Sequence, residues 1–567
     1  MTIDPALDSA LAAPLLEPAL ENESAEQSGA GIAQATSLLA VGTIASRVLG
    51  FAQELLIAHY FGAGPLVDAF QIAITVPRDL YDLAISGHVN SALVPVLSEY
   101  AAKNKAELWR LVSALLSLTA LLLSGLVLLL ELFAGQIVTV YRGSPAPIEP
   151  LPLTQLVYHT PISAADIALT VSLLRVTSPA LLFLGLFAIV SGMLYALKRF
   201  TLPAFAAALF NGAVVGSLVL LAPRIGIQGA AIGWVIGAAA QLILQFFALR
   251  DAHFRFDLGG ALAHPGVRRI GLLYAPVLLS LVVDVLINRT FSYHLASQAG
   301  NGSIAYMNWA TSLREFPMGL VGTAISIAVL PTLARQALSV TQQQAFKDTL
   351  GQGMRLVLML IIPATVGMFV LAGPLVGLLF EHGAFTANDT TITAIALRLY
   401  LLGIPFAAID LLLVFAFYAR KDTLTPAIVG LISLAFYMLI ALALRTGYSF
   451  YGLMIADSVK FLIHVTLCLL LLRQRLNGLG AQRLLLTLGK SVLATVLMAL
   501  VVYASMRLIS DLNNDDLRQR VPLVVRYALV IVPSALGGIV YLSLAYMLRM
   551  REFTWFIQAI RRRGTGR

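Results

Sequence analysis

The stretch SRVLGFAQELLIAHYFGAG, residues 46 to 64, follows an apolar segment and predicts the second half of a membrane-spanning helix. It nevertheless carries two charged residues, Arg47 and Glu54. A charged side chain near the centre of a bilayer costs roughly 2.5 to 3.5 kcal/mol on insertion scales. Because the two charges are seven residues apart, they lie on one face of the helix. We expect that face to meet water or other polar groups rather than lipid.

The composition predicts a polytopic membrane protein. Of the 567 residues 59% are hydrophobic and 12% charged, and the mean hydropathy is +0.86, far from the composition of a soluble globular domain. The net charge of +9 comes from short basic runs between apolar segments, as the positive-inside rule expects, so nucleic-acid binding is not predicted. The single cysteine, Cys468, excludes a disulfide framework and a multi-cysteine metal cluster.

The apolar segments predict an all-α fold with about fourteen transmembrane helices, because about 20 apolar residues span the hydrocarbon core. The expected spans are 32–60, 68–98, 109–134, 167–196, 203–222, 226–249, 270–297, 304–334, 354–380, 392–418, 425–445, 451–473, 485–508 and 524–549. Connections on one side are rich in Lys and Arg, whereas 61–67, 298–303 and 381–391 on the other side have none. We therefore expect both termini in the cytoplasm.

An internal repeat sets the expected domain organisation. LYALKRFTLPA (194–204) aligns with FYARKDTLTPA (417–427) at an offset of 223, and ALVPVLSEY (92–100) resembles AVLPTLARQ (328–336) at an offset of 236. Both predicted repeats start on the same side, so they are parallel. The expected parts are a disordered acidic tail (1–30), an N-terminal lobe of six helices (31–250), a cytoplasmic linker (251–269), a C-terminal lobe of six helices (270–473), two further helices (474–549) and a basic cytoplasmic tail (550–567).

Charged residues within the spans concentrate in the first two helices of each repeat. They are Arg47 and Glu54, then Asp68, Arg78, Asp79 and Asp82, then Asp284 and Arg289, and finally Arg314 and Glu315. Intramembrane charge usually lines a cavity, so we expect these helices to border a wet cleft between the lobes. Structural ion pairs are the alternative, since Arg78 and Asp82 are four residues apart. Pro77 and Pro317 fall inside two of the same helices and are candidate hinges.

Motifs for other chemistry are absent or incomplete. LGKSV (488–492) lacks the first glycine of a phosphate-binding loop and begins a membrane helix. No zinc-protease, paired-cysteine or nucleophile motif occurs. We expect a membrane transporter rather than an enzyme, with no cofactor, no metal site and no catalytic residue.

Several strings resemble the MurJ (MviN) family, the lipid II flippases of the multidrug/oligosaccharidyl-lipid/polysaccharide exporter superfamily. They are SRVLGF, LIAHYFGAGPLVDAF, ALVPVLSEY, RFTLPAFAAALFN, LREFPMGLVGTAISIAVLPTLAR, FEHGAFT and FYARKDTLTPA, and they extend over most of the chain beyond residue 35. The resemblance implies a carrier that moves the undecaprenyl-pyrophosphate-linked precursor of peptidoglycan by alternating access, in cell wall biogenesis and the maintenance of cell shape. Arg47 matches the family's first cavity arginine, and Asp68 an acidic position of its second helix.

The chain departs from the family pattern at three cavity arginines. Gln53 stands where an arginine is usual and is followed by Glu54 in place of an aspartate; Tyr81 and Ser312 stand at two other positions where basic residues are expected. Arg78 and Arg289 are candidates to replace the missing charge. Arg314 is two residues from Ser312, so it points elsewhere on the helix and is a poorer substitute. The expected substrate-binding residues are Arg47, Gln53, Glu54, Asp68, Arg78, Tyr81, Asp284, Arg289, Ser312 and Glu315.

Two alternatives to a lipid II flippase stay open on sequence alone. The carboxylates Asp79, Asp82 and Asp284 suit cations or protons, which favours a flippase for another polyprenyl-linked glycan or a cation or drug antiporter of the same superfamily. The other alternative is a membrane scaffold that does not transport. The expected partners are the lipid-linked glycan, membrane lipids and a coupling ion, H⁺ or Na⁺, at Asp68, Asp284 or Glu54.

Overall fold

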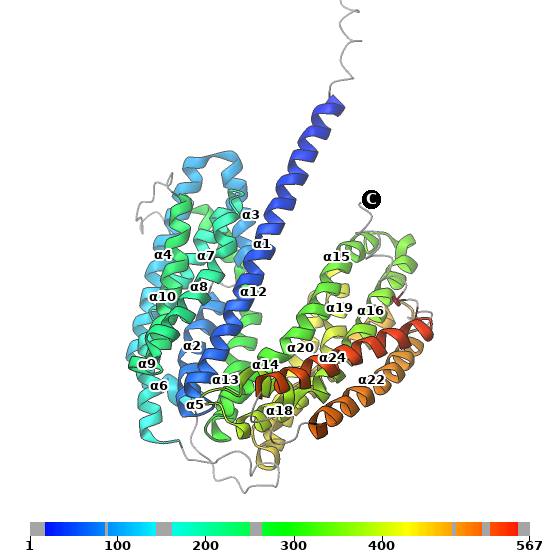
Figure 1. Ribbon diagram of the computed structural model, residues 1–567. Helices are drawn as coiled ribbons and strands as arrows, with labels where there is room; N and C mark the ends of the chain where they lie inside the picture. Colours follow the sequence, from blue (N-terminus) through cyan, green and yellow to red (C-terminus); the bar gives the residue numbers. More distant parts are fainter. Residues whose placement is uncertain are drawn as a thin grey trace, which may run out of the picture. The chain divides into compact units, whose positions relative to one another are not determined.

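The computed structural model describes residues 17–84, 89–142, 162–249, 264–478, 483–512, 522–550 and 552–553. Within these ranges the chain is built of helices with no strand (Figure 1). The helices up to the middle of the chain are α1 (Glu17–Phe61), α2 (Pro65–Ala84), α3 (Val89–Lys103), α4 (Lys105–Leu132), α5 (Ala134–Arg142), α6 (Ala164–Thr177), α7 (Ala180–Ala196), α8 (Thr201–Leu220), α9 (Ala222–Ile225), α10 (Gln228–Phe246) and η2 (Phe247–Leu249).

The remaining helices follow residue 264. They are α12 (Pro265–Leu281), the π-helix η3 (Val282–Arg289), α13 (Thr290–Gln298), α14 (Ser303–Pro317), the π-helix η4 (Met318–Thr323), α15 (Ala324–Gln336), η5 (Val340–Gln342), α16 (Gln343–Val370), α17 (Ala372–Phe380), α18 (Ala387–Leu401), α19 (Ile404–Ala419), α20 (Leu424–Tyr448), α21 (Tyr451–Arg475), α22 (Leu484–Leu512) and α24 (Pro522–Met547). The all-α prediction is confirmed.

The chain divides into two compact units that interleave in sequence. The first comprises Met1–Gln53, Val76–Glu131 and Arg175–Leu279, and the second Glu54–Thr75, Leu132–Leu174 and Ser280–Arg567. The second unit therefore takes the end of α1 and the start of α2 from the first part of the chain. The expected linker lies largely, and the basic tail almost wholly, outside the described residues, and the repeat boundaries remain a prediction.

Close backbone packing holds the first unit together. A Cβ added to Gly42 in α1 would lie 1.9 Å from the carbonyl oxygen of Ala204 in α8, so the two helices approach as closely as a glycine permits. Further along the same pair, the Asn211 amide nitrogen donates to the carbonyl and hydroxyl oxygens of Ser46, at 2.9 and 3.1 Å. Gln245 of α10 donates to the Ser191 hydroxyl of α7 at 2.6 Å. These hydrogen bonds satisfy polar groups that lipid would leave without partners.

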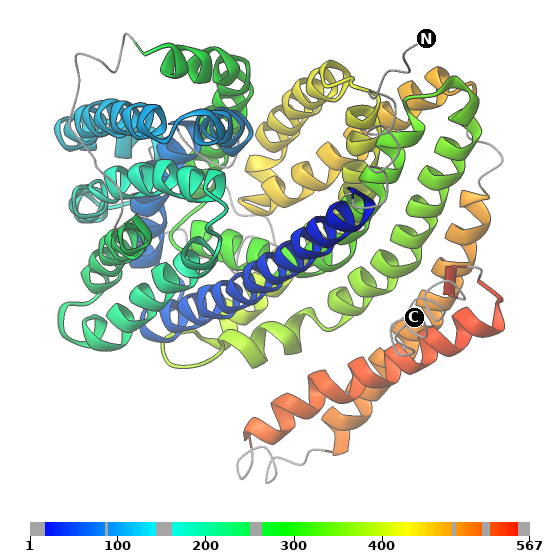
Figure 2. The ribbon, with the colours of Figure 1, turned by 90° about the horizontal axis from the view of Figure 1, so that it is seen from above.

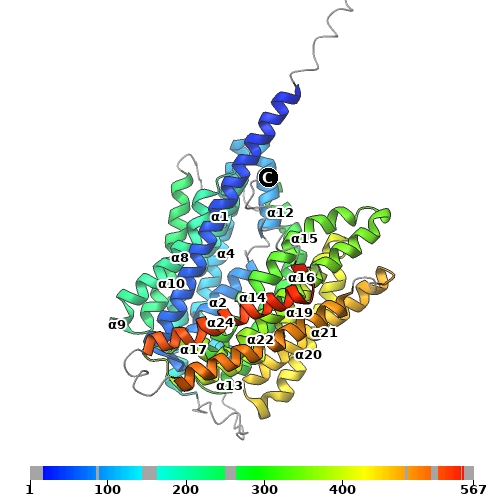
Figure 3. The same cartoon turned by 45° about the vertical axis from the view of Figure 1, so that its right-hand side comes forward.

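Two apolar cores organise the second unit. One lies among α16, α19 and α21 and contains Phe346, Leu412, Phe417 and Cys468. The other joins α16 to α22 and α24 through Met359, Met498 and Tyr541. The orange and red ribbons of α22 and α24 run alongside each other (Figure 2), and α21 packs against both α19 and α20 (Figure 3).

The number of fourteen spans is not confirmed. Within the described ranges, 11 helices are long and apolar enough to cross a membrane, or 12 if the bent pair Ala387–Leu401 and Ile404–Ala419 is one span. The two expected spans outside this set are 68–98 and 270–297. Residues 85–88 of the first and several side chains of the second lie outside the described structure, so these two spans remain a prediction.

The turns after α7 and α19 have the same geometry, as the internal repeat predicts. Lys198 and Lys421, which are 223 residues apart, have φ of 57° and 60°. The amide of each donates three residues back, to the carbonyls of Tyr195 and Tyr418. The amides of Arg199 and Asp422 both reach five residues back, which completes the same helix-ending motif. Sequence similarity and backbone geometry therefore repeat at one offset.

The expected disordered tail needs a correction. Helix α1 begins at Glu17, so residues 17–30, expected to be disordered, belong to the helix. This segment contains Ala, Glu and Gln, which favour helix, and its acidic residues lie near the helix N-terminus, where they are favourable. Residues 1–16 lie outside the described part of the chain.

We expect Gly42→Ala to destabilise the protein by about 1–3 kcal/mol, because the added methyl group must push α1 away from the Ala204 carbonyl. The measurement is thermal unfolding of the full chain in detergent. Gly216→Ala in α8 is the matched control: nothing lies within 4 Å of its added Cβ, and alanine favours the helix by roughly 0.5–1 kcal/mol. Equal stability of the two variants would contradict the close α1–α8 contact.

Candidate functional site

Two of the predicted cationic residues are exposed in the first unit. Arg47 in α1 and Arg78 in α2 have exposed side chains and make no ion pair with the described residues. Gln53, one of the arginine replacements, is 7% exposed, and Tyr81 is half-buried. The alternative reading, an ion pair between Arg78 and Asp82, does not occur in the described structure.

Asp68 caps the N-terminus of α14 in the second unit. Its side chain is 2% exposed, and its two carboxylate oxygens accept hydrogen bonds from the amides of Gly302 at 2.6 Å and Ala305 at 2.9 Å. The amides at the start of a helix have no partner within that helix, and its dipole favours a negative charge there. Gly302 has φ of 87°, which suits glycine at this turn. Asp68 therefore fastens the start of α2 to the start of α14.

A backbone contact joins the end of α1 to the loop between α17 and α18. The Ala384 amide donates to the His59 carbonyl at 2.8 Å. A Cβ on Gly383, whose φ is 65°, would lie 2.3 Å from that same carbonyl oxygen, and one on Gly62 would lie 2.5 Å from the Ala384 carbonyl oxygen. We call these contacts, together with the Asp68 cap, the three-loop contact. It joins the loops at 61–67, 298–303 and 381–391, none of which contains Lys or Arg.

Aromatic packing surrounds the three-loop contact. The Trp309 ring of α14 lies 5.8 Å from Phe380 and 5.1 Å from Phe385 between ring centroids. Its indole nitrogen donates to Glu54 Oε2 at 3.1 Å. Nearby, the Tyr306 hydroxyl donates to Asp389 at 2.5 Å. The FEHGAFT string thus contributes two rings to a cluster with Trp309, and Glu54 is bound within the second unit.

The other predicted residues of the second unit are dispersed. Arg289 is half-buried at the end of η3 and takes part in polar or ring interactions. Ser312 is half-buried in α14, whereas the Glu315 side chain is 62% exposed and lies 3.9 Å from Arg314. The side chain of Asp284 lies outside the described structure. Glu54 and Asp68 thus both accept hydrogen bonds from the region of α14. Ser312 and Glu315 also lie on α14, but the structure does not join them to these two carboxylates.

The candidate hinge prolines lie in different surroundings. Pro77 is buried inside α2, which continues past it to Ala84. Pro317 is buried at the end of α14, directly before η4. A proline removes one helical hydrogen bond and often accompanies such irregularities. Hinge motion at either residue remains a prediction.

Arg314 belongs to a buried ionic cluster, which explains why it is a poor substitute for a cavity arginine. Its side chain is 16% exposed and pairs with Asp457 of α21, and its guanidinium carbon lies 4.3 Å from the centroid of the Tyr400 ring. Lys460 binds the other Asp457 oxygen at 2.6 Å. Two cations therefore share one carboxylate and aromatic faces, an arrangement that stabilises charge away from bulk water.

A chain of hydroxyl and amide groups lies in the same unit. Lys460 is 5.3 Å from the centroid of the Tyr437 ring, and the Tyr437 hydroxyl is 2.7 Å from that of Ser292. The next residue, Tyr293, accepts a hydrogen bond from Thr75 and donates one to Asn308, each at 3.2 Å. Helices α2, α13, α14, α20 and α21 are thereby linked through polar side chains.

The sequence prediction missed Asp457 and Lys460. The signal was present, because both lie in the apolar span 451–473 and are three residues apart. Charge inside a span is a default functional signal, but the prediction concentrated on the first two helices of each repeat. Asp410 in α19 was missed for the same reason.

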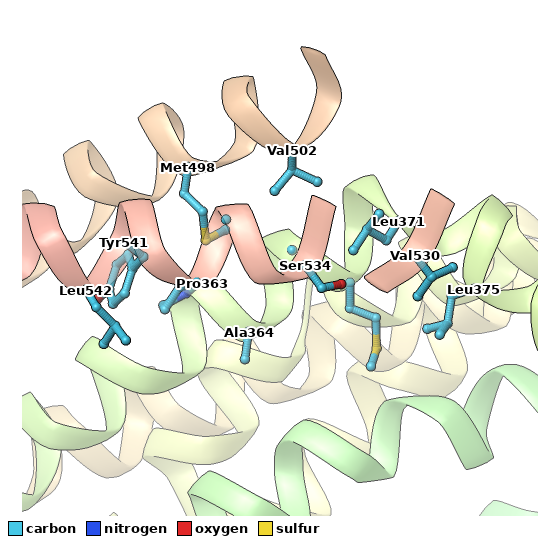
Figure 4. A pocket seen from close by; sticks show the side chains of 14 residues that line it. Pro363, Ala364, Leu371, Leu375, Met498, Val502, Val530, Ser534, Tyr541 and Leu542 are labelled. Carbon is cyan, nitrogen blue, oxygen red and sulfur yellow. The ribbon is translucent and has the colours of Figure 1, made fainter. Parts of the chain in front are cut away.

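An apolar cavity of about 470 Å³ lies between α16, α17 and the pair α22 and α24 (Figure 4). Pro363, Met368, Leu371, Met498, Val530 and Leu542 are among its lining residues. Two ion pairs lie outside this cavity. Arg355 of α16 binds Glu552 at 2.8 Å, and Arg526 of α24 binds Glu381 at 2.9 Å. Such a lining favours hydrocarbon over water.

Comparisons with known proteins agree with this architecture. The family model described as "Lipid II flippase MurJ" matches residues 57–512. A relative from Burkholderia cenocepacia named "Lipid II flippase MurJ" is 31% identical over 391 residues, 68% of this chain and 72% of the relative. A relative from Bdellovibrio bacteriovorus named "Probable lipid II flippase MurJ" is 28% identical and covers 91% of this chain and 95% of its own length.

Solved structures give the same result. One titled "Lipid II flippase MurJ, inward closed conformation" matches with a TM-score of 0.73 at 25% identity, covering 90% of this chain and 99% of that one. An inward-facing multidrug resistance MATE family transporter of the MOP superfamily matches with a TM-score of 0.61 at 14% identity, covering 77% of this chain and 96% of that one; this match indicates a shared fold. The chain is a multi-span membrane protein, and it belongs to the MurJ family.

Proposed function

We propose that the chain carries lipid II, the undecaprenyl-pyrophosphate-linked precursor of peptidoglycan, across the bacterial cytoplasmic membrane by alternating access. The family match and the names of the relatives support this substrate. The expectation that the protein is a transporter and not an enzyme agrees with the family. The other polyprenyl-linked glycans and the antiporter alternative receive no comparable support.

The observation that carries the mechanism is the three-loop contact. Its loops contain no Lys or Arg, whereas the connections on the other side are rich in both; by the positive-inside rule, the contact then faces the outside and both termini face the cytoplasm. The Asp68 cap and the His59–Ala384 hydrogen bond therefore act as an outer closure. In this proposal the headgroup enters from the cytoplasm while these bonds hold, and it leaves after they break.

Arg47 and Arg78 are proposed to bind the pyrophosphate. A diphosphate that leaves bulk water needs cationic hydrogen-bond donors, and the planar guanidinium group binds its oxygens in pairs. Both side chains are exposed and make no ion pair with the described residues. Arg314 is held by Asp457 and is not proposed to bind substrate. Arg289 remains a candidate from the sequence.

The membrane potential supports export. Moving two negative charges outward across 100 mV, inside negative, releases up to about 4.6 kcal/mol, at 2.3 kcal/mol per charge. We propose that a coupling ion, H⁺ or Na⁺, acts through Asp68 or Glu54. Neutralising Asp68 weakens the cap of the closure, and neutralising Glu54 weakens its hydrogen bond with Trp309. Asp284 remains a candidate from sequence. The hydrocarbon tail stays in lipid and can use the apolar cavity beside α22 and α24.

Arg47→Ala is expected to lower the transport of lipid II roughly tenfold or more. A hydrogen bond to a charged group contributes about 1.5–3 kcal/mol, and 1.4 kcal/mol corresponds to a factor of ten. The measurement is flipping of a fluorescent lipid II analogue in proteoliposomes, together with rescue of a strain depleted of its own flippase. Arg110→Ala in α4 is the control, because that exposed arginine pairs only with Glu107 in the described structure. Export at the wild-type rate by the Arg47 variant would exclude the proposed headgroup site.

Asp68→Asn is expected to shift the equilibrium between the closed and outward-open states by about tenfold toward the open one. The asparagine side chain offers one acceptor oxygen and no charge to the backbone N–H groups of Gly302 and Ala305, which both bind the aspartate. Spin labels at the exposed positions His59 and His382 measure the separation of the facing loops. We expect a longer, broader distance distribution in the variant. Asp166→Asn is the matched control, because Asp166 caps α6 through the Ser163 amide at 2.9 Å. Identical distributions in wild type and Asp68→Asn would show that the cap does not hold the closure.

A further inference from the structure

Asp410, His464 and Cys468 form a cluster of metal-ligand side chains in the second unit, separate from the proposed headgroup residues. Asp410 lies on α19, and the other two lie on α21 at a spacing of four residues, which places them on one face. One ligand atom from each residue lies within 4.8 Å of the other two. The sequence prediction assigned no metal site, because the third ligand is 54 residues away from His464 and belongs to another helix.

The distances agree with coordination by one imidazole nitrogen. Nδ1 of His464 is 3.6 Å from the Cys468 sulfur, and two such ligands on a tetrahedral zinc, with bonds of about 2.0 and 2.3 Å, lie about 3.5 Å apart. Nδ1 is 2.5 Å from Asp410 Oδ1. That distance is a hydrogen bond and must lengthen by about 0.8 Å when a metal ion takes the place of the shared proton.

The orientation of the imidazole favours the same ligand atom. Its Nδ1 faces both the carboxylate and the thiol. Its Nε2 faces α20, at 3.7 Å from where a Cβ on Gly430 would lie. A histidine in this orientation presents Nδ1 to a metal ion bound between α19 and α21.

Charge balance selects the class of ion. A thiolate and a carboxylate together carry two negative charges, and the metal-binding form of histidine is neutral. A divalent ion makes the site neutral, whereas a monovalent ion leaves one negative charge in an apolar region, which is unfavourable. Cys468 is fully buried within the core that contains Leu412, Phe417 and Leu472. Sulfur, nitrogen and oxygen ligands together suit zinc and related transition metals rather than magnesium or calcium.

We propose that Asp410, His464 and Cys468 bind a divalent transition-metal ion of the zinc class. Binding releases the thiol proton and the proton shared by His464 and Asp410. The three protein ligands leave a fourth coordination position for water or another small ligand. The ion joins α19 to α21 and so strengthens the core of the second unit.

The test uses the full chain in detergent, with its affinity tag removed and metals stripped by a chelator. Cobalt(II) is titrated as a spectroscopic substitute for zinc. We expect one cobalt ion per chain, with a sulfur-to-metal charge-transfer band that zinc abolishes by displacement. Because the chain has a single cysteine, the band in the wild type assigns the sulfur ligand without any variant.

Cys468→Ser is expected to remove the band and to weaken zinc binding by at least about tenfold. Loss of a residue that only supports a metal ligand typically lowers affinity by that much, so loss of a ligand should lower it at least as far. His464→Gln and Asp410→Asn are expected to weaken binding to a similar degree. His382→Gln, which removes an exposed histidine of the second unit, is the matched control and should bind as the wild type does. Absence of the band in the wild type, or undiminished zinc affinity in Cys468→Ser, would overturn the proposal and leave a hydrogen-bonded trio. Neither result depends on lipid II transport.

Discussion

The two hydrogen bonds from the start of α14 to the carboxylate of Asp68 fasten a segment from early in the chain to the second unit. A helix that begins inside a protein needs partners for its first amides. Here the partner comes from a residue 234 positions earlier in the chain. This bond explains why residues 54–75 group with the second unit rather than with their sequence neighbours. The interleaving of the units and the closure of the three loops therefore share one physical cause.

Apolar length and composition were sufficient to predict an all-α membrane fold with many spans. The offset of 223 corresponds to a structural repeat, since Lys198 and Lys421 both adopt a left-handed conformation that costs an ordinary residue about 1–2 kcal/mol. The predicted spans at 68–98 and 270–297 carry polar residues whose partners on other helices a hydropathy average ignores. Thr75, for example, donates to Tyr293. The helical start at Glu17 was missed because acidity suggested disorder, although acidic residues also favour a helix N-terminus.

The sequence points to candidate site residues where charge interrupts an apolar helix. Arg47 and Arg78 could be named from the sequence because each is conspicuous in an apolar helix. Asp457, Lys460 and Asp410 were equally conspicuous, but their partners lie on other helices, and a sequence does not give those distances. Arg314 shows the difference: its position on the helix excluded it as a substitute, while its partner Asp457 became visible only in the fold. The same holds for His464 and Asp410.

The cost of burying charge separates structural from functional ions in this protein. In the second unit, the charges of Arg314, Lys460, Arg355 and Arg526 are each matched by a carboxylate within about a hydrogen bond, and such pairs are strongly destabilised when one partner is lost. They are therefore poorly suited to exchange a substrate. Arg47 and Arg78 have no such ion pair among the described residues and keep their exposure. An anionic headgroup gains most where no protein carboxylate already competes for the guanidinium, which is why Arg47 and Arg78, rather than Arg314, are proposed to bind it.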